Sequence, residues 1–247
     1  MIPKFSIITV TYNAEASIEA TIDSVVGQNY NDFEYIIVDG ASTDRTIALL
    51  NPYKKQINAL VSEKDDGLYH AMNKGIQIAK GEFLLFLNAG DRFLDNSVLK
   101  EVDTAISSKT RIISADFINV KQEGAMNGRH IYTKACTLQN LKKDFVACHQ
   151  TVFIHRDVVS TYDLSYKILA DYKWVVQASL RCMPDSIEHL KKPIVYYLDG
   201  GISAQHVRQN LIERVRLHQE LFGRIQVLIN TPNYLRRVLR ELKRILL

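Results

Sequence analysis

Four side chains that could hold a nucleotide or a metal ion stand where predicted β-strands end. Asn13, Asp39 and Glu63 each follow an apolar, β-branched segment, and Asp91 follows the unbroken apolar run 83–87. A short apolar run bounded by turn residues is typical of a strand buried on both faces. Ligands of open α/β sheets bind beyond the carboxyl ends of the strands. The sequence therefore predicts a polar, cation-attracting crevice along one edge of a sheet.

Asp91 is the strongest candidate for a metal ligand. Neither Cys nor His stands beside it, so its carboxylate suits a hard divalent cation such as Mg²⁺ or Mn²⁺. Such an ion would hold phosphate oxygens as well. Considered alone, an Asp in a loop is more often the N-cap of the next helix. The other polar strand ends favour the metal site.

Strand-like and helix-like segments alternate through the first half of the chain. Strands are predicted at residues 5–10, 33–38, 57–62, 83–87 and 111–119, and helices at 14–26, 46–50, 68–79 and 95–107. Such a βαβ series predicts an α/β fold with a mostly parallel, doubly wound sheet. The pattern is less regular after residue 120. There we expect a hairpin tip at 121–129, strands at 151–154 and 194–198, and a helix at 169–180.

The phosphate-binding loops of common nucleotide enzymes do not occur in the sequence. The first predicted strand runs into Thr11-Tyr12-Asn13, without the glycines of the dinucleotide fingerprint. Neither a GxxxxGK[ST] loop nor a GxSxG elbow is present. A bound diphosphate would therefore need another source of positive charge, such as a metal ion on Asp91.

Composition and cysteine usage indicate an ordinary globular protein. The 247 residues are 47% hydrophobic and 23% charged, which permits a core and excludes global disorder. Cys136, Cys148 and Cys182 are widely spaced without a CxxC pair, which argues against a disulfide framework or a zinc site and fits a reducing cytoplasm. The sequence predicts no signal peptide, and no apolar run reaches the ~18 residues that a membrane span needs.

Positive charge is concentrated in the C-terminal segment. Residues 206–247 contain nine Lys and Arg against three Glu, whereas the rest of the chain has a net charge of −2. A nucleic-acid-binding protein would spread basic residues over its folded face, so no nucleic-acid partner is expected. The last predicted helix is amphipathic, with Leu235, Leu239 and Leu242 at helical spacing and arginines on the other side. It could pack on the domain with a solvated basic face, or lie on an anionic membrane surface.

Several short motifs, taken in order, resemble those of family 2 glycosyltransferases with a GT-A fold, especially bacterial enzymes that build surface polysaccharides. The motifs occupy residues 6–13, 37–44, 62–63, 66–69, 71–75, 81, 86–91, 149–150, 170–172 and 200–203. Each is weak alone, but the ordered combination is specific. The resemblance implies a GT-A domain at 1–205, with a nucleotide-sugar half at 1–120 and an acceptor half at 121–205, followed by basic amphipathic helices at 206–247.

The resemblance also implies roles for individual residues. Asp91 would hold a divalent metal, Mn²⁺ or Mg²⁺, and Asp171, at the start of a predicted helix, would be the catalytic general base. The donor-binding residues would be Thr11, Asn13, Glu15, Asp39, Glu63, Lys74 and Asn88. The acceptor-binding residues would be His149, Gln150 and Tyr172.

Some of these positions also have simpler structural explanations. Asp171 could instead stabilise the dipole of its helix. His149 and Gln150 could belong to a structural loop. His70 is expected on the surface of a helix, and Trp174 in the core.

The implied activity is inverting, metal-dependent transfer of a sugar from a nucleotide sugar, most simply a UDP-sugar, to a saccharide acceptor. Asn88 and Gly90 stand where the family commonly has acids, so the metal would rest largely on Asp91, the diphosphate and water. A lipid-linked acceptor at the cytoplasmic face of a membrane would explain the basic C-terminal helix, which could bind that membrane. The alternatives are transfer to a polyprenyl phosphate and a sugar-nucleotide-binding protein without turnover. The presence of both Asp91 and Asp171 favours an enzyme.

Overall fold

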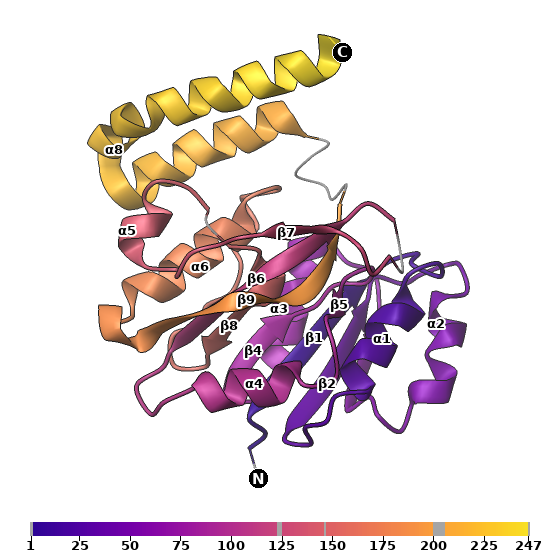
Figure 1. Ribbon diagram of the computed structural model, residues 1–247. Helices are drawn as coiled ribbons and strands as arrows, with labels where there is room; N and C mark the ends of the chain where they lie inside the picture. The colour runs from indigo at the N-terminus through magenta and orange to yellow at the C-terminus, as the bar shows by residue number, and fades with distance from the viewer. Residues whose placement is uncertain (1, 123–124, 146, 200–205, 247) are drawn as a thin grey trace.

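A single curled sheet carries helices on both faces and two further helical arms at one end (Figure 1). The computed structural model describes residues 2–122, 125–145, 147–199 and 206–246, with side chains of residue 237 and of 240–246 left out. Within these residues the strand order is β3-β2-β1-β4-β8-β6-β9-β5, and β7 pairs with β6.

The elements follow the predicted alternation of strands and helices. The strands are β1 (Phe5–Thr11), β2 (Phe33–Asp39), β3 (Ala59–Ser62), β4 (Phe83–Phe86), β5 (Arg92–Phe93), β6 (Ile112–Val120), β7 (Arg129–Ile131), β8 (Val152–His155) and β9 (Ile187–Leu198). The α-helices are α1 (Ile18–Val26), α2 (Thr46–Leu49), α3 (Leu68–Ile78), α4 (Val98–Ala105), α5 (Leu138–Leu141), α6 (Ala170–Leu180) and α8 (Val207–Leu246). Short 3₁₀ turns are η1 (Asn51–Tyr53), η2 (His149–Thr151) and η3 (Pro184–Ser186).

The first four strands along the chain, β1 to β4, pair only in parallel with one another. The register places Thr11 beside Asp39, and Asp39 beside Ser62. Ile8 pairs with Phe86, the last residue of β4, and the N–H of Ala89 in the following loop donates to the carbonyl of Val10 near the end of β1. The predicted parallel sheet is confirmed here, and the polar residues that follow these strands meet at one edge.

The second part of the sheet is mixed. β8 runs antiparallel to both β4 and β6, whereas β9 runs parallel to β6. β9 begins at Ile187, well before the predicted start at residue 194, because Lys191, Lys192 and Pro193 hide its first half from a hydrophobic pattern. The pairing of β9 shifts register opposite Asp116, and a bulge of this kind accommodates a proline that lacks an N–H.

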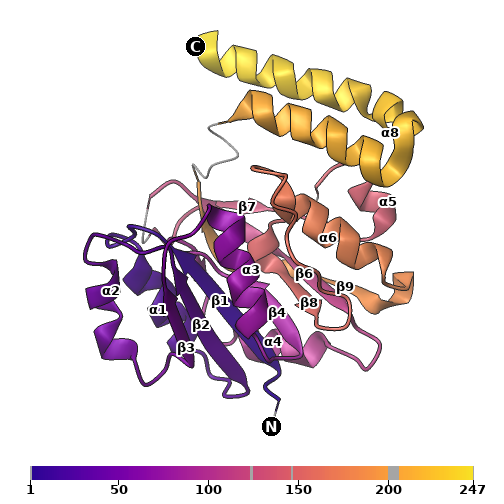
Figure 2. The ribbon, with the colours of Figure 1, turned by 180° about the vertical axis from the view of Figure 1, so that it is seen from behind.

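Two hydrophobic clusters fill the two faces of the sheet. Figure 1 shows α1 and α4 in front of the strands, and Ile22 and Val102 of these helices belong to one buried cluster with Phe5. Figure 2, from behind, shows α3 and α6 covering the other face. Trp174 of α6 is fully buried there and stacks on Tyr162 with ring centroids 4.9 Å apart, which confirms its predicted place in the core.

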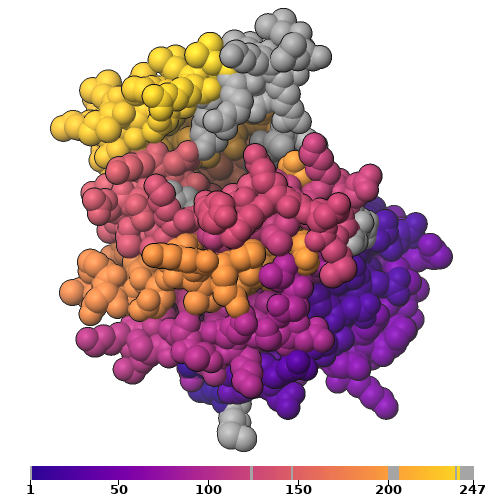
Figure 3. Space-filling model, in the orientation of Figure 1, coloured from indigo at the N-terminus to yellow at the C-terminus, as the bar shows by residue number. Residues whose placement is uncertain are grey.

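The C-terminal segment forms two helical arms, as predicted. Both belong to α8, which bends at Gly223, where φ is +82°. The arms lie side by side over α5 and α6 (Figures 1 and 2), and the second arm forms an outer layer at one end of the molecule (Figure 3). Leu217 and His218 of the first arm are fully buried, so this arm is packed on the domain.

Glu213 of the first arm fixes the start of α6. Its carboxylate is 2% exposed and accepts hydrogen bonds from the backbone N–H groups of Lys167, Ile168 and Leu169, at 2.8–2.9 Å. Lys167 and Ile168 lie just before α6, and Leu169 is its N-cap, whose N–H has no partner within the helix. A carboxylate at this end of a helix is also favoured by the helix dipole. The arm therefore holds the helix that carries Asp171.

We expect Glu213→Ala to lower the free energy of unfolding by about 2–3 kcal/mol, because it leaves buried N–H groups without acceptors. Although burial alone would raise it, hydrogen bonds from Gln209 and the backbone hold the pKa of Glu213 below its usual 4.5. The stabilisation is complete above pH 4.5 and is lost as the pH falls through the lowered pKa.

Urea unfolding of the full chain at several pH values measures this effect. The matched control is Glu101→Ala, which removes a half-exposed ion pair with Lys192 and should cost less than about 1 kcal/mol. Equal losses in the two variants would contradict the capping role of Glu213.

Candidate active site

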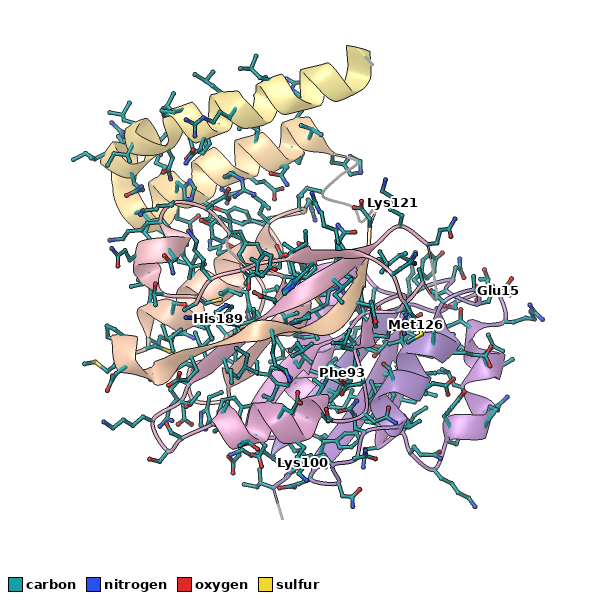
Figure 4. The ribbon with its side chains drawn as sticks, in the orientation of Figure 1. Glu15, Phe93, Lys100, Lys121, Met126 and His189 are labelled. Atoms are coloured by element: carbon teal, nitrogen blue, oxygen red, sulfur yellow. The ribbon has the colours of Figure 1, made fainter. Side chains whose placement is uncertain are left out.

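A cavity of about 490 Å³ opens at the edge of the sheet where the parallel strands end. Lys121, just after β6, marks this edge, and Lys100 of α4 marks the opposite one (Figure 4). The cavity is lined by residues from the end of β4, from η2, from the start of α6 and from the end of β9. Its lining includes the predicted residues Asn88, Asp91, His149, Gln150 and Asp171.

His149 links the two sides of this cavity. Its Nδ1 lies 3.2 Å from Oδ2 of Asp171, and its Nε2 lies 3.3 Å from Nδ2 of Asn88. Because the amide of Asn88 donates, Nε2 accepts, and the Nδ1–H of the ring donates to Asp171. The predicted base is thus oriented by a side chain that also contacts the donor side.

Asp171 occupies the first turn of α6 with its carboxylate partly open to the cavity. The side chain is 16% exposed, and Oδ1 accepts a hydrogen bond of 2.8 Å from the backbone N–H of Tyr172. The Tyr69 hydroxyl lies 3.4 Å from the same oxygen and donates to the carbonyl of Ile168 at 2.8 Å. Tyr69 was not predicted as a site residue, although it lies within the 66–69 motif.

Asp91 is held from two directions. Oδ1 accepts a hydrogen bond of 2.8 Å from the backbone N–H of Leu198, and Oδ2 accepts one from the amide of Gln150. Burial raises the pKa of Asp91 to about 7, against the lowering effects of the Leu198 N–H and of His149. Gln150 therefore contacts the predicted metal ligand directly, and it is itself fixed by the Cys148 thiol, which donates to Oε1.

Four predicted donor-binding residues gather around the loop that follows β2. Asn13 accepts a hydrogen bond from the backbone N–H of Thr43, and Glu15 accepts one from that of Arg45. Asp39 is fully buried and accepts from Ser42 and Ser62. A nucleotide would have to displace Ser42 to reach this carboxylate. The fourth, Thr11, has a buried hydroxyl with no partner in the protein.

Glu63 and Lys74 form part of an ion-pair cluster beside that loop. Lys74 Nζ lies 2.7 Å from Glu63 and 2.8 Å from Asp65, a buried acid that the sequence did not single out. Although burial alone would lower it, the hydrogen bonds that Lys74 donates to Asp65 and Glu63 raise the pKa of Lys74. His70, partly exposed as expected, also contacts Asp65, at 3.2 Å.

Tyr172 does not reach the cavity, so its predicted contact with an acceptor needs correction. Its side chain is fully buried, and its hydroxyl donates to the carbonyl of Leu141 and lies 2.9 Å from Nε2 of His218. The ring packs on Phe145 with centroids 4.9 Å apart. Residues 170–172 are adjacent in sequence, but a helix turns successive side chains by about 100°, so Asp171 and Tyr172 point in different directions.

The oxygen atoms of the cavity fit a hard divalent cation that takes most of its ligands from phosphate and water. Among the described residues, no group of three or more His, Cys, Asp or Glu could hold a metal. Asp91 offers a carboxylate at the cavity wall, and the buried Oδ1 of Asn88 has no partner in the protein. Mg²⁺ and Mn²⁺ commonly combine one or two such oxygens with phosphate and water.

Comparison with known proteins identifies the family. Residues 6–163 match the sequence profile of Glycosyl transferase family 2. The chain belongs to this family. A glycosyltransferase of PGL/p-HBAD biosynthesis from Mycobacterium bovis is 29% identical over 239 residues, which are 92% of this chain and 90% of that protein. TuaG of Bacillus subtilis, named for teichuronic acid biosynthesis, is 29% identical over 159 residues, 63% of each chain.

Solved structures confirm the GT-A fold. S. aureus TarS 1-349 in complex with UDP matches with a TM-score of 0.65 at 22% identity, over 87% of this chain and 64% of that chain. The mannosyltransferase PcManGT of Pyrobaculum calidifontis, solved with GDP-Man and Mn²⁺, matches with a TM-score of 0.59 at 18% identity, over 96% and 74%. The protein is therefore a glycosyltransferase in which the cavity lies at the edge expected for a ligand.

We expect His149→Ala to reduce glycosyltransferase turnover on the order of 10²-fold, because the Asp171 carboxylate loses the contact that orients it. The affinity for the donor should change little. His149→Asn should recover much of the turnover, since its amide nitrogen stands where the imidazole Nδ1 stood. Turnover of donor and donor Kd, measured on both variants, check this. Two results would contradict positioning of Asp171 by His149. One is an equal loss of turnover in His149→Ala and His149→Asn, and the other is a loss of donor affinity that parallels the loss of turnover.

Proposed function

We propose that the protein is an inverting, metal-dependent glycosyltransferase that moves a sugar from a nucleotide sugar to a hydroxyl of a saccharide acceptor. The observation that carries the proposal is the position of Asp171. Its carboxylate lies in the wall of the same cavity as Asn88 and Asp91, and His149 joins it to Asn88. A base and a donor-binding edge therefore share one space.

Asp171 would act as the general base. Oδ2, held by His149, accepts the proton of the acceptor hydroxyl while the hydroxyl oxygen attacks the anomeric carbon. The bond to the diphosphate breaks on the opposite face of the sugar, so one displacement inverts the configuration and no enzyme nucleophile is required. General-base assistance of this kind contributes about 10²–10⁴-fold.

Asp91, with the amide oxygen of Asn88, would hold the divalent cation, which as a Lewis acid would stabilise charge on the departing diphosphate. Thr11 and Asn88 support donor binding at this edge, because each has a buried oxygen that lacks a partner in the protein. An unpaired buried oxygen is costly, and a bound ligand would satisfy it.

A UDP-sugar is the proposed donor, and a saccharide carried on a lipid is the proposed acceptor. The likeness to TarS, which was solved with UDP, supports the first. The names of the M. bovis and B. subtilis relatives, which refer to glycolipid and surface-polymer synthesis, support the second. We place the reaction at the cytoplasmic face of a membrane. Among the described helices, none is long and apolar enough to cross a bilayer.

A thermal-shift panel of nucleotide sugars, with and without Mn²⁺, tests the donor site. A ligand at ~100 times its Kd should add ~2.7 kcal/mol of stability. We expect one UDP-sugar to stabilise the protein only with Mn²⁺, and Asp91→Asn to abolish that stabilisation. The control Asp157→Asn changes a carboxylate that is 65% exposed, outside the cavity, and should respond like the wild type.

Two results would contradict the proposal. Stabilisation by nucleotide sugars without any metal would remove Asp91 from its assigned role. Failure of every nucleotide to stabilise a folded protein would exclude the donor site altogether.

A further inference from the structure

The second arm of α8 turns its apolar side chains toward solvent. Five of them are 58–75% exposed: Ile225, Leu228, Ile229, Leu235 and Leu239. Their spacing of three, four and seven residues places them on one face of the helix. We call these five residues the outer apolar face. A helix packed on a globular domain normally buries such a stripe, so this arm is inverted relative to the usual pattern.

Polar contacts hold the inner face of the same arm where its side chains are described. Asn230 is 1% exposed and donates from Nδ2 to the carbonyl of Lys142 at 2.7 Å. The Tyr234 hydroxyl lies 2.5 Å from Nδ1 of the buried His218. Buried polar groups with satisfied hydrogen bonds specify one orientation, because rotating the helix would leave them unpaired. The outward direction of the apolar face is therefore fixed by the fold.

The charge of this segment indicates what would cover the outer apolar face. Residues 206–247 have a net charge of +6, and Arg224 and Arg236 on the second arm are exposed. A second copy of the chain would bring the same positive charge against it. An anionic bilayer would meet both properties, since apolar side chains enter the acyl boundary and basic side chains contact acidic headgroups.

The position of the arms relates this surface to the catalytic cavity. Glu213 of the first arm binds the backbone of Lys167 and Ile168, and both residues line the cavity. The segment that carries the outer apolar face is therefore connected to the cavity wall through Glu213.

We propose that the outer apolar face of α8 docks the enzyme on an anionic lipid bilayer, where it meets a lipid-linked saccharide acceptor. Only the identity of the acceptor in this inference rests on the proposed glycosyltransferase function. The docking itself needs no turnover. The cavity wall is then held at a fixed place relative to the membrane through Glu213.

Vesicle co-sedimentation of the full chain tests the docking. We use vesicles of phosphatidylcholine alone and of phosphatidylcholine with phosphatidylglycerol. Wild-type protein should bind the anionic vesicles and be released by added salt. Leu228→Ser/Ile229→Ser should weaken that binding at least about tenfold, because two exposed aliphatic side chains no longer enter the bilayer.

The matched control is Leu180→Ser/Met183→Ser, which replaces two side chains that are 50% and 70% exposed at the far end of α6. It should bind as the wild type does. Equal loss in both double variants, or no binding of wild-type protein to anionic vesicles, would overturn the proposal. So would a dimer in solution that only Leu228→Ser/Ile229→Ser dissociates, with no vesicle binding, since a second copy would then cover the face.

Donor binding, measured without lipid by the thermal shift with a nucleotide sugar and Mn²⁺, separates the two proposals. Leu228→Ser/Ile229→Ser should keep the wild-type thermal shift while losing vesicle binding. If wild-type protein bound vesicles but no nucleotide sugar stabilised it, the glycosyltransferase mechanism would fail and the docking would stand. If the variant lost the thermal shift as well, the outer apolar face would serve the fold and not the membrane.

Discussion

The parallel pairing of β1 with β2 and with β4 decides where this protein can do chemistry. Strands that run in the same direction end at the same edge, so Thr11, Asp39 and the 88–91 loop are brought together. The second half of the chain brings the carboxylate of Asp171 to this edge. It does so through α6, whose N-cap Leu169 is bound by Glu213 and whose Asp171 contacts His149. The site is thus shared by both halves of the sheet.

The two acids of the cavity differ because their surroundings differ. Asp91 is buried, which raises its pKa to about 7, so a positive partner is needed to keep it ionised at neutral pH. Asp171 is partly open and contacts an imidazole N–H. A metal ion and a diphosphate would suit the first environment, and an acceptor hydroxyl would suit the second.

Much of the fold could be predicted because local sequence determines it. The apolar run 83–87 and the polar residues after each strand are visible without any tertiary information. The first half of β9 was missed, since Lys191, Lys192 and Pro193 do not form a strand pattern. Tyr172 was assigned wrongly because its burial depends on Leu141 and His218, which are remote in the chain. The contact of Gln150 with Asp91 also depends on tertiary structure.

The orientation of the C-terminal helices could not be predicted from local sequence either. Its amphipathic pattern was evident, but the pattern alone does not tell which face meets the domain. That choice depends on Asn230 and Tyr234, whose partners Lys142 and His218 lie elsewhere in the fold. Among the described side chains of the second arm, Asn230 and Tyr234 are buried while the outer apolar face is exposed. The expectation of a helix packed on the domain is met by the first arm, through Leu217 and His218.

The role of Asp171 is the central claim, and one comparison tests it most directly. Donor turnover and donor Kd are measured for wild-type protein and for Asp171→Asn, which preserves shape and removes the basic carboxylate. The account predicts that turnover falls about 10²–10⁴-fold while the donor Kd stays near the wild-type value. Turnover that survives the substitution would contradict the account, because the proton would then be taken by another group.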